Sequence, residues 1–188
     1  MSLCSNCSTP SLTSLTLATA NSKAPSKTLN RYEIAELGPG SIICTPHFAP
    51  LGDHSISVTS EARTESTIGP VSTKMRYMVV LAIFPEHMIA CPLTSHSGRG
   101  LANKSREVRE EFMGIRAEGN RTYINDTPYR SLIVRRGEKF KLLDSSVVHV
   151  MAPVVATTKA TASLVGRVTR ESAADLVAVF KDMLPRIY

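Results

Sequence analysis

Tryptophan is absent from this sequence, and aromatic residues as a group make up only 5% of it. With so few rings, the chain offers few platforms on which the bases of a single-stranded nucleic acid could stack. Long apolar runs are absent as well, since the longest, Met78 to Phe84, has the length of a strand and a membrane-spanning helix needs about 18 residues. We therefore expect no membrane span.

Cysteine is scarce, with 4 residues in the chain. Cys4 and Cys7 have the spacing of a metal-ligand pair, but a zinc site needs a second pair and the sequence offers none, so we predict no bound metal. Cys44 and Cys91 lie in apolar runs and are expected to be buried as small hydrophobic residues. No signal-peptide-like apolar stretch opens the chain, which favours the reducing cytoplasm.

The motifs of the common cofactor enzymes are missing too. We find no phosphate-binding loop, dinucleotide fingerprint, His-Glu-x-x-His pair, Ser-His-Asp spacing or paired catalytic carboxylates, and so predict no cofactor. The formal net charge is +6, but the basic residues are scattered along the chain. A nucleic-acid-binding surface usually shows clustered Lys and Arg, which makes this composition a weak indication of one.

What the sequence does contain is enough for one domain. Its 188 residues fall within the usual range of a single domain, and 43% of them are hydrophobic, which suffices for a core. Residues 1–31 are dense in Ser and Thr and contain no acidic residue, so they can bury little surface by themselves. The sequence predicts a polar N-terminal arm over 1–31 and one domain over 32–188.

Short apolar runs separated by turn residues predict a mainly β domain. Residues 50–73 are predicted as a loop with one weak strand from Ile56 to Thr59, and Ser105 to Phe112 as a short helix. The expected strands are 41–45, 75–83, 88–94, 131–135, 147–151 and 162–168.

The C-terminal helix is the clearest predicted element and spans about 170–184. Thr169 is the expected N-cap and Pro185 marks the end. Its apolar face is predicted to comprise Ala173, Leu176, Val177, Phe180 and Leu184. Several short strands followed by one helix favour a small, strongly curved β-barrel with the helix packed against it.

Three sequence blocks support this fold. They are Gly40-Ser41-Ile42-Ile43, then Met75 to Leu81 with Cys91 to Ser95, and finally Leu164 to Val168 before the helix. In this order they resemble the PemK/MazF barrel, which is SH3-like. The chain is more closely similar to an uncharacterised fungal domain family over about residues 37–184, most specifically through Thr94 and Ser97-Gly98-Arg99-Gly100. His96 replaces an aromatic residue of that family, and Val147 replaces an arginine.

The resemblance implies one candidate activity. In PemK/MazF ribonucleases an arginine on the first strand of the second block and a threonine ending the next strand act on the scissile phosphate, and Arg76 and Thr94 occupy those positions. RNA cleavage through its own 2′-hydroxyl needs no metal. The plainer alternative is that Arg76 forms an ion pair and Thr94 ends a strand.

A second candidate activity follows from the weak basicity, the few aromatic rings and the lost family arginine. This is a cofactor-independent cyclase of fungal natural-product biosynthesis, of the Diels–Alderase (pericyclase) type, acting on an apolar small molecule. Such an enzyme needs an apolar pocket that folds the substrate and one or two donors that polarise a carbonyl. The predicted catalytic residues are Arg76, Thr94, His96 and Arg99, and the predicted substrate-binding residues are Met78, Met88, Tyr129, His149 and Met151.

Between these activities the sequence favours the cyclase, with the RNA-binding protein or metal-independent endoribonuclease as the alternative. RNA is a partner only under that alternative. A non-catalytic interaction barrel and a homodimer both remain open from the sequence.

Overall fold

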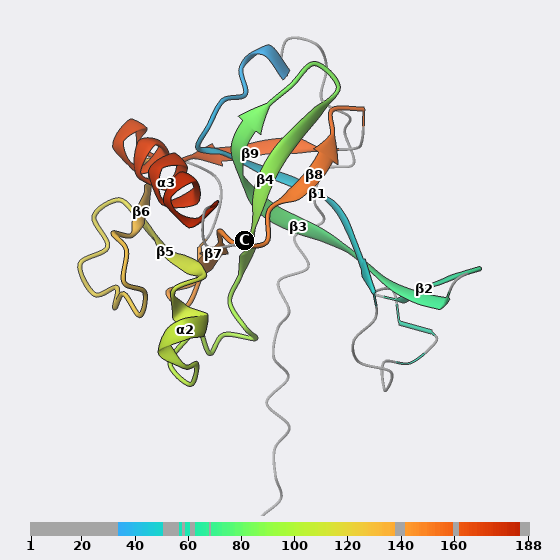
Figure 1. Ribbon diagram of the computed structural model, residues 1–188, viewed down its shortest axis with the longest axis horizontal. Helices are drawn as coiled ribbons and strands as arrows, with labels where there is room; N and C mark the ends of the chain where they lie inside the picture. Colours follow the sequence, from blue (N-terminus) through green and yellow to red (C-terminus); the bar gives the residue numbers. More distant parts are fainter. Residues whose placement is uncertain are drawn as a thin grey trace, which may run out of the picture.

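The computed structural model describes residues 34–50, 57, 59–60, 63–67, 69–137, 142–159 and 162–184. The predicted arm over 1–31, with Cys4 and Cys7, lies outside the described residues. The domain is mainly β with a C-terminal helix, which confirms the predicted class (Figure 1).

Nine strands and two named helices make up the described domain. The strands are β1 (Ser41–Pro50), β2 (Arg63–Ser66), β3 (Gly69–Ile83), β4 (His87–Thr94), β5 (Phe112–Ala117), β6 (Leu132–Val134), β7 (Val147–His149), β8 (Val154–Thr157) and β9 (Ser163–Arg167). The helices are α2 (Arg106–Arg109) and α3 (Arg170–Met183).

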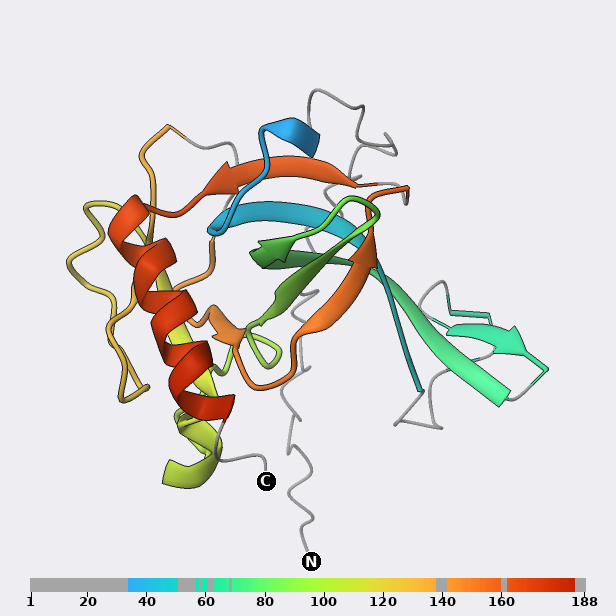
Figure 2. The ribbon, with the colours of Figure 1, turned by 45° about the horizontal axis from the view of Figure 1, so that its top comes forward.

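The strands form one mixed sheet in the order β6-β5-β7-β4-β3-β1-β9, with β2 paired to β3 and β8 paired to β4. Only β5 and β6 run parallel among the named pairs. Strand β4 links β6, β5 and β7 on one side of this path to β3, β1 and β9 on the other. It pairs with β3 as far as Pro92 and then with β7 through Leu93 and Thr94. Residues from distant parts of the sequence therefore meet at the end of β4 (Figure 2).

The sheet is not closed or strongly curled, so the predicted barrel is not established. The strands at the two ends of the path, β6 and β9, approach each other through one isolated bridge between Val134 and Val168. Next to it, the N–H of Arg135 donates to the carbonyl of Arg167 at 2.9 Å.

Two large apolar clusters cover the two faces of the central strands. Alternation along β3 sends Val79 and Leu81 into the cluster that packs under α3, and Met78 and Val80 into the other. Helix α3 adds the fully buried Leu176 to the first cluster. The helix therefore closes one face of the sheet.

Helix α3 begins where the sequence predicted. The Thr169 hydroxyl accepts the N–H of Ser172 at 3.3 Å, so the predicted N-cap is confirmed. Met183 is buried while Leu184 is 42% exposed, so the last residue of the predicted apolar face is wrong by one position.

Three strands were not predicted. The expected loop over 50–73 contains β2 and the first residues of β3. These residues form strands because β3 extends well past the core and pairs there with β2. The expected helix from Ser105 ends at Arg109, and Phe112 begins β5. Strand β8 pairs along β4. Of the weak strand at 56–59, the described residues Ser57 and Thr59 are not in a strand.

None of the helices in the described ranges combines the length and the apolar character that crossing a bilayer requires.

Candidate functional site

The loop that follows β4 holds two residues in an unusual backbone conformation. His96 has a φ of 47° and Ser97 a φ of 60°, in the left-handed region that residues other than glycine rarely adopt. The turn is closed by the N–H of Gly100, which donates to the Ser95 carbonyl at 2.9 Å. Such conformations persist only where the surroundings impose them, and they gather at functional sites.

The His96 side chain is half-buried, and its Nε2 is fully buried with no hydrogen-bond partner among the described residues. Burial lowers the pKa of His96, and the positive charges of Lys104 and His149 lower it further. The imidazole is therefore neutral at neutral pH, with one nitrogen able to donate and the other to accept. A buried polar atom without a partner is costly, so its presence at Nε2 calls for an explanation such as a buried water or a functional role.

Phe112 sits between His96 and a second histidine. The His96 ring meets Phe112 edge-on, with centroids 5.5 Å apart, and His149 stacks on Phe112 at 4.2 Å. This stacking follows from the β5–β7 register, in which Phe112 lies opposite His149. The pairing of short strands thus brings together two imidazoles that are far apart in the sequence.

Glu111 orients the second imidazole. Its Oε2 lies 3.1 Å from Nε2 of His149, which is hydrogen-bond distance. A carboxylate can only accept, so this contact requires a proton on Nε2 of His149.

The loop rests on a small apolar base and on Thr94. Leu101, Phe112 and Val147 form a buried cluster with Val108 against it. Thr94 ends β4 opposite Val147, and its hydroxyl accepts the N–H of His96 at 3.3 Å. Thr94 therefore supports the histidine loop.

A hollow of about 290 Å³ opens beside this loop, and we call it the His96 hollow. Its rim carries two cations, Arg99 and Lys104, and neither takes part in the ion pairs of the described residues. The rim therefore suits an electron-rich group such as a carbonyl, carboxylate or phosphate oxygen. The lining residues are His96, Ser97, Arg99, Gly100, Asn103 and Lys104.

The structure brings together four of the residues predicted for the site, namely Thr94, His96, Arg99 and His149. Arg76 belongs to another strand pair, opposite Thr45 of β1. There, burial lowers the pKa of His47, and the charge of Arg76 lowers it further. The predicted β3–β4 pairing is present, but it ends at Met78 and Pro92, before Arg76 and Thr94 are reached.

The residues predicted to form the apolar wall lie elsewhere. Met78 and Met88 are buried in the core cluster on the face away from α3, with 1% and 0% of their surface exposed. Tyr129 and Met151 are half-buried against the other large cluster. The lining of the His96 hollow is accordingly polar rather than methionine-rich, so this hollow offers hydrogen-bond donors but not the apolar pocket that the predicted cyclase needs.

Sequence reasoning missed three residues of the site, namely Lys104, Glu111 and Phe112. Glu111 and Phe112 fell at the end of a predicted helix, which gave no reason to place them beside a histidine. Their position depends on β7 inserting between β4 and β5, and this pairing leaves no local signal in the sequence.

Other chemistries find less support in the described residues. Burial raises the pKa of the Cys91 thiol to about 12, so it carries no reactive thiolate at neutral pH. No group of three or more His, Cys, Asp and Glu side chains gathers there in a way that could hold a metal.

The chain was compared with protein-family models, curated proteins and solved structures, and none of them matches it. The resemblance to the fungal domain family and to the PemK/MazF barrel therefore stays a prediction. The chemistry of the site has to be inferred from its own geometry.

Proposed function

We propose that the protein is a cofactor-independent enzyme that acts on an apolar small molecule and polarises a carbonyl of that substrate through His96. The observation that carries this proposal is the buried Nε2 of His96, which has no partner among the described residues. Because Nε2 is buried, a substrate carbonyl oxygen entering the His96 hollow completes that hydrogen bond only after the loop from Ser95 to Gly100 shifts to uncover it.

The lowered pKa of His96 suits this role. A neutral imidazole donates a hydrogen bond without giving up its proton, and such a donor can stabilise charge that grows on a carbonyl oxygen. The strained loop and the contact with Phe112 fix the orientation of the His96 ring. Arg99 is the second donor of the same hollow.

The reaction that we propose is an intramolecular cyclisation of the Diels–Alder type in fungal natural-product biosynthesis. Two carbon–carbon σ bonds form from π bonds of one molecule, and no proton, electron or leaving group is exchanged. An alkene conjugated to a carbonyl reacts faster with the diene when the carbonyl oxygen accepts a hydrogen bond. The terpenoid or polyketide class of the substrate is an expectation from the sequence.

We also propose that the fold is an open relative of the SH3-like PemK/MazF barrel. The support is the strand path, whose two end strands approach each other through the Val134–Val168 bridge. The free, buried thiols of Cys44 and Cys91 suit the reducing cytoplasm that the sequence favours.

A metal-independent endoribonuclease is the second candidate. The observation in its favour is the pair of imidazoles on Phe112, with Lys104 and Arg99 nearby. One histidine would take the proton of the 2′-hydroxyl while the other protonates the 5′-oxygen that leaves, giving a 2′,3′-cyclic phosphate. Against it stands the separation of Arg76 and Thr94 onto different strand pairs, because the family chemistry uses both.

Turnover by matched histidine variants tests the proposal. His96→Ala should slow cyclisation of a linear polyene carrying a conjugated carbonyl by about 100-fold, which corresponds to a loss of about 3 kcal/mol of transition-state stabilisation. His87→Ala is the control, since His87 stacks on Phe84 next to the β3–β4 turn. Product formation is followed by chromatography and mass spectrometry.

His96→Ala and a further variant, His149→Ala, separate the two candidates. Metal-free cleavage of RNA that is lost in both His96→Ala and His149→Ala would favour the ribonuclease and contradict the cyclase. Unchanged cyclisation by His96→Ala would remove the basis of the proposal.

A further inference from the structure

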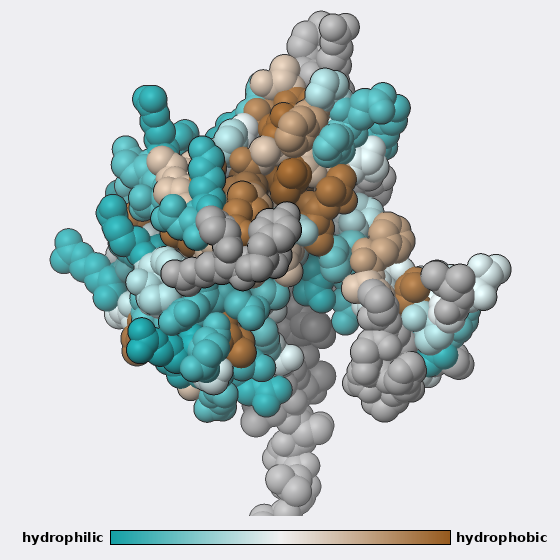
Figure 3. All heavy atoms as spheres, viewed as in Figure 1, coloured by the Kyte–Doolittle hydropathy of each residue, from teal (hydrophilic) through white to brown (hydrophobic). Residues whose placement is uncertain are grey.

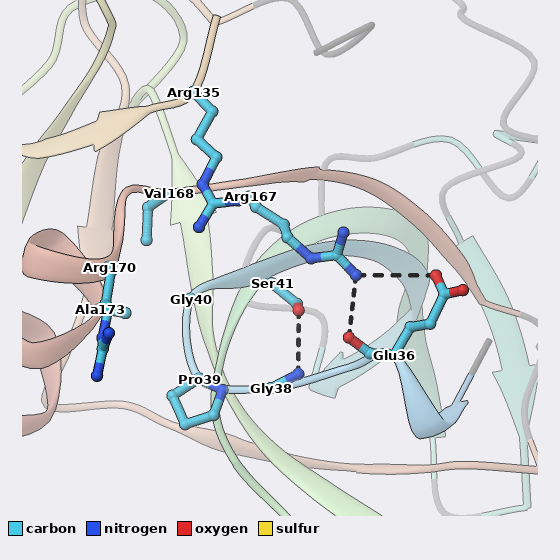
Figure 4. A pocket seen from close by; sticks show the side chains of 10 residues that line it. All are labelled: Glu36, Gly38, Pro39, Gly40, Ser41, Arg135, Arg167, Val168, Arg170 and Ala173. Carbon is cyan, nitrogen blue, oxygen red and sulfur yellow. Dashed lines mark hydrogen bonds and ion pairs between the residues drawn. The ribbon is translucent and has the colours of Figure 1, made fainter. Parts of the chain in front are cut away.

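A second hollow, of about 340 Å³, lies where the start of β1 meets the end of β9 and the beginning of α3 (Figure 4). We call it the arginine hollow, because arginines from three different segments line it. Arg135 follows β6, Arg167 ends β9 and Arg170 begins α3. We propose that the arginine hollow binds the phosphate group of a small phosphorylated molecule.

Two of the three arginines are available to such a ligand. Arg167 is engaged by Glu36, since its Nη2 donates to the Glu36 carbonyl at 2.9 Å and lies 3.9 Å from the carboxylate. Arg135 and Arg170 are exposed and enter none of the ion pairs of the described residues. Figure 4 shows Arg167 turned toward Glu36, Arg170 on the other side of Gly40, and Arg135 reaching in above Gly40.

The wall between these arginines is rigid. The N–H of Gly40 donates to Val80 at 2.8 Å, and the Gly40 carbonyl accepts from Val168 at 2.9 Å. A Cβ on Gly40 would lie 2.7 Å from Cβ of Ala173 and 2.8 Å from Cγ2 of Val168, so only glycine fits. The hollow therefore exists before any ligand arrives.

Ser41 adds a neutral donor. It is buried, lines the hollow, and its Oγ accepts the N–H of Gly38 at 3.1 Å. No described residue accepts the hydroxyl hydrogen of Ser41, which leaves it free to donate to a ligand oxygen.

This set of donors fits phosphate. The guanidinium group presents several N–H donors in one plane and binds phosphate oxygens in pairs, which a single ammonium group cannot do. Glu171 is the competing carboxylate: hydrogen bonds from its own N–H and from Thr169 are the main causes of its lowered pKa, and the charges of Arg170 and Arg135 add to them. A dianionic phosphate carries more charge than Glu171 and should compete with it for both arginines.

The proposal is independent of the proposed function, since the arginine hollow shares no residue with the His96 hollow. Activity at His96 could fail while phosphate still binds here, and the reverse also holds.

The test is titration calorimetry of the full chain with inorganic phosphate and with pyrophosphate at constant ionic strength. The double variant Arg135→Ala/Arg170→Ala should weaken binding by about tenfold or more, because hydrogen bonds to charged groups are worth about 1.5–3 kcal/mol. The control Arg106→Ala/Arg121→Ala removes the same charge from exposed arginines outside the hollow and should leave binding unchanged. Glu171→Gln should tighten the binding of both anions, because it removes the competing carboxylate.

Three results would overturn the proposal. One is no binding of either anion at concentrations up to about 20 mM, which corresponds to less than about 2.3 kcal/mol of binding free energy. Another is an equal loss of affinity in the control double variant. The third is unchanged binding of both anions by the Arg135→Ala/Arg170→Ala variant.

Discussion

At the scale of single residues, Gly40 and Gly137 form a natural comparison. Both have a φ of 86°, but a Cβ at Gly40 would collide with Ala173 and Val168, while a Cβ at Gly137 would meet nothing within 4 Å. Gly137→Ala should therefore cost about 1–2 kcal/mol for the left-handed backbone alone. Gly40→Ala adds the collision, about 1–3 kcal/mol more, because α3 and β9 have to move. Urea unfolding of the two variants measures both, and equal losses would contradict the close packing of α3 on Gly40.

The candidate site was predictable in part at this scale. Thr94, His96 and Arg99 lie within a few residues of each other, so their proximity could be predicted from the sequence alone. His149 joins them only because β7 pairs with both β4 and β5. Arg76 was placed with them on the assumption that the β3–β4 ladder continues, whereas β4 leaves β3 after Pro92. A change of strand partner is decided by long-range packing, and local pattern cannot reveal it.

At the scale of elements, α3 was predicted well because its cap and its apolar period are both local. Strands β1, β3 and β4 contain apolar runs and were also expected, as were β6, β7 and β9. Strand β2 has the sequence Arg-Thr-Glu-Ser, is mostly exposed, and exists only as a partner of the extended β3. Nothing in its composition distinguishes it from a loop.

Two leucines of the α3 region test how the helix is docked. Leu176 is fully buried and Leu184, just after the helix, is 42% exposed. Leu176→Ala should lower the free energy of unfolding by about 2–5 kcal/mol, because it removes apolar contacts and leaves a cavity. Leu184→Ala should lower it by less than about 1 kcal/mol. Denaturant unfolding gives both values, and a small loss for Leu176→Ala would mean that α3 does not cover the sheet as described.

At the scale of the whole molecule, the surface is unevenly apolar. Hydrophobic side chains gather over the β4 and β8 part of the sheet beside α3 (Figure 3). Val155 of β8 is 71% exposed, and Phe84, after β3, is 42% exposed. Contiguous apolar surface of this kind is common at sites of association. The homodimer that the sequence left open stays a prediction.

The stability of the whole molecule should depend on pH in two steps. Burial lowers the pKa values of His47 and His96 from 6.5, and the charges of Arg76, beside His47, and of Lys104 and His149, beside His96, lower them further. Below about pH 6.5 the unfolded chain therefore binds protons that the folded protein does not, and the free energy of unfolding falls as the pH falls. Hydrogen bonds to the carboxylates lower the pKa values of Glu107 and Glu171 from 4.5. These two carboxylates therefore stabilise the folded protein above about pH 4.5, and that stabilisation is lost as the pH falls below it.

Thermal unfolding across the pH range separates the two steps. The protein should show a first decline in melting temperature from about pH 6.5 down and a second from about pH 4.5 down. The double variant His47→Gln/His96→Gln should lose the first decline, because glutamine has no proton to bind, and should keep the second as an internal control. An unchanged first decline in this variant would show that other groups are responsible for it. A melting temperature that rises between about pH 7 and pH 5 would contradict the lowered histidine pKa values, because a histidine more basic in the folded protein stabilises it on protonation.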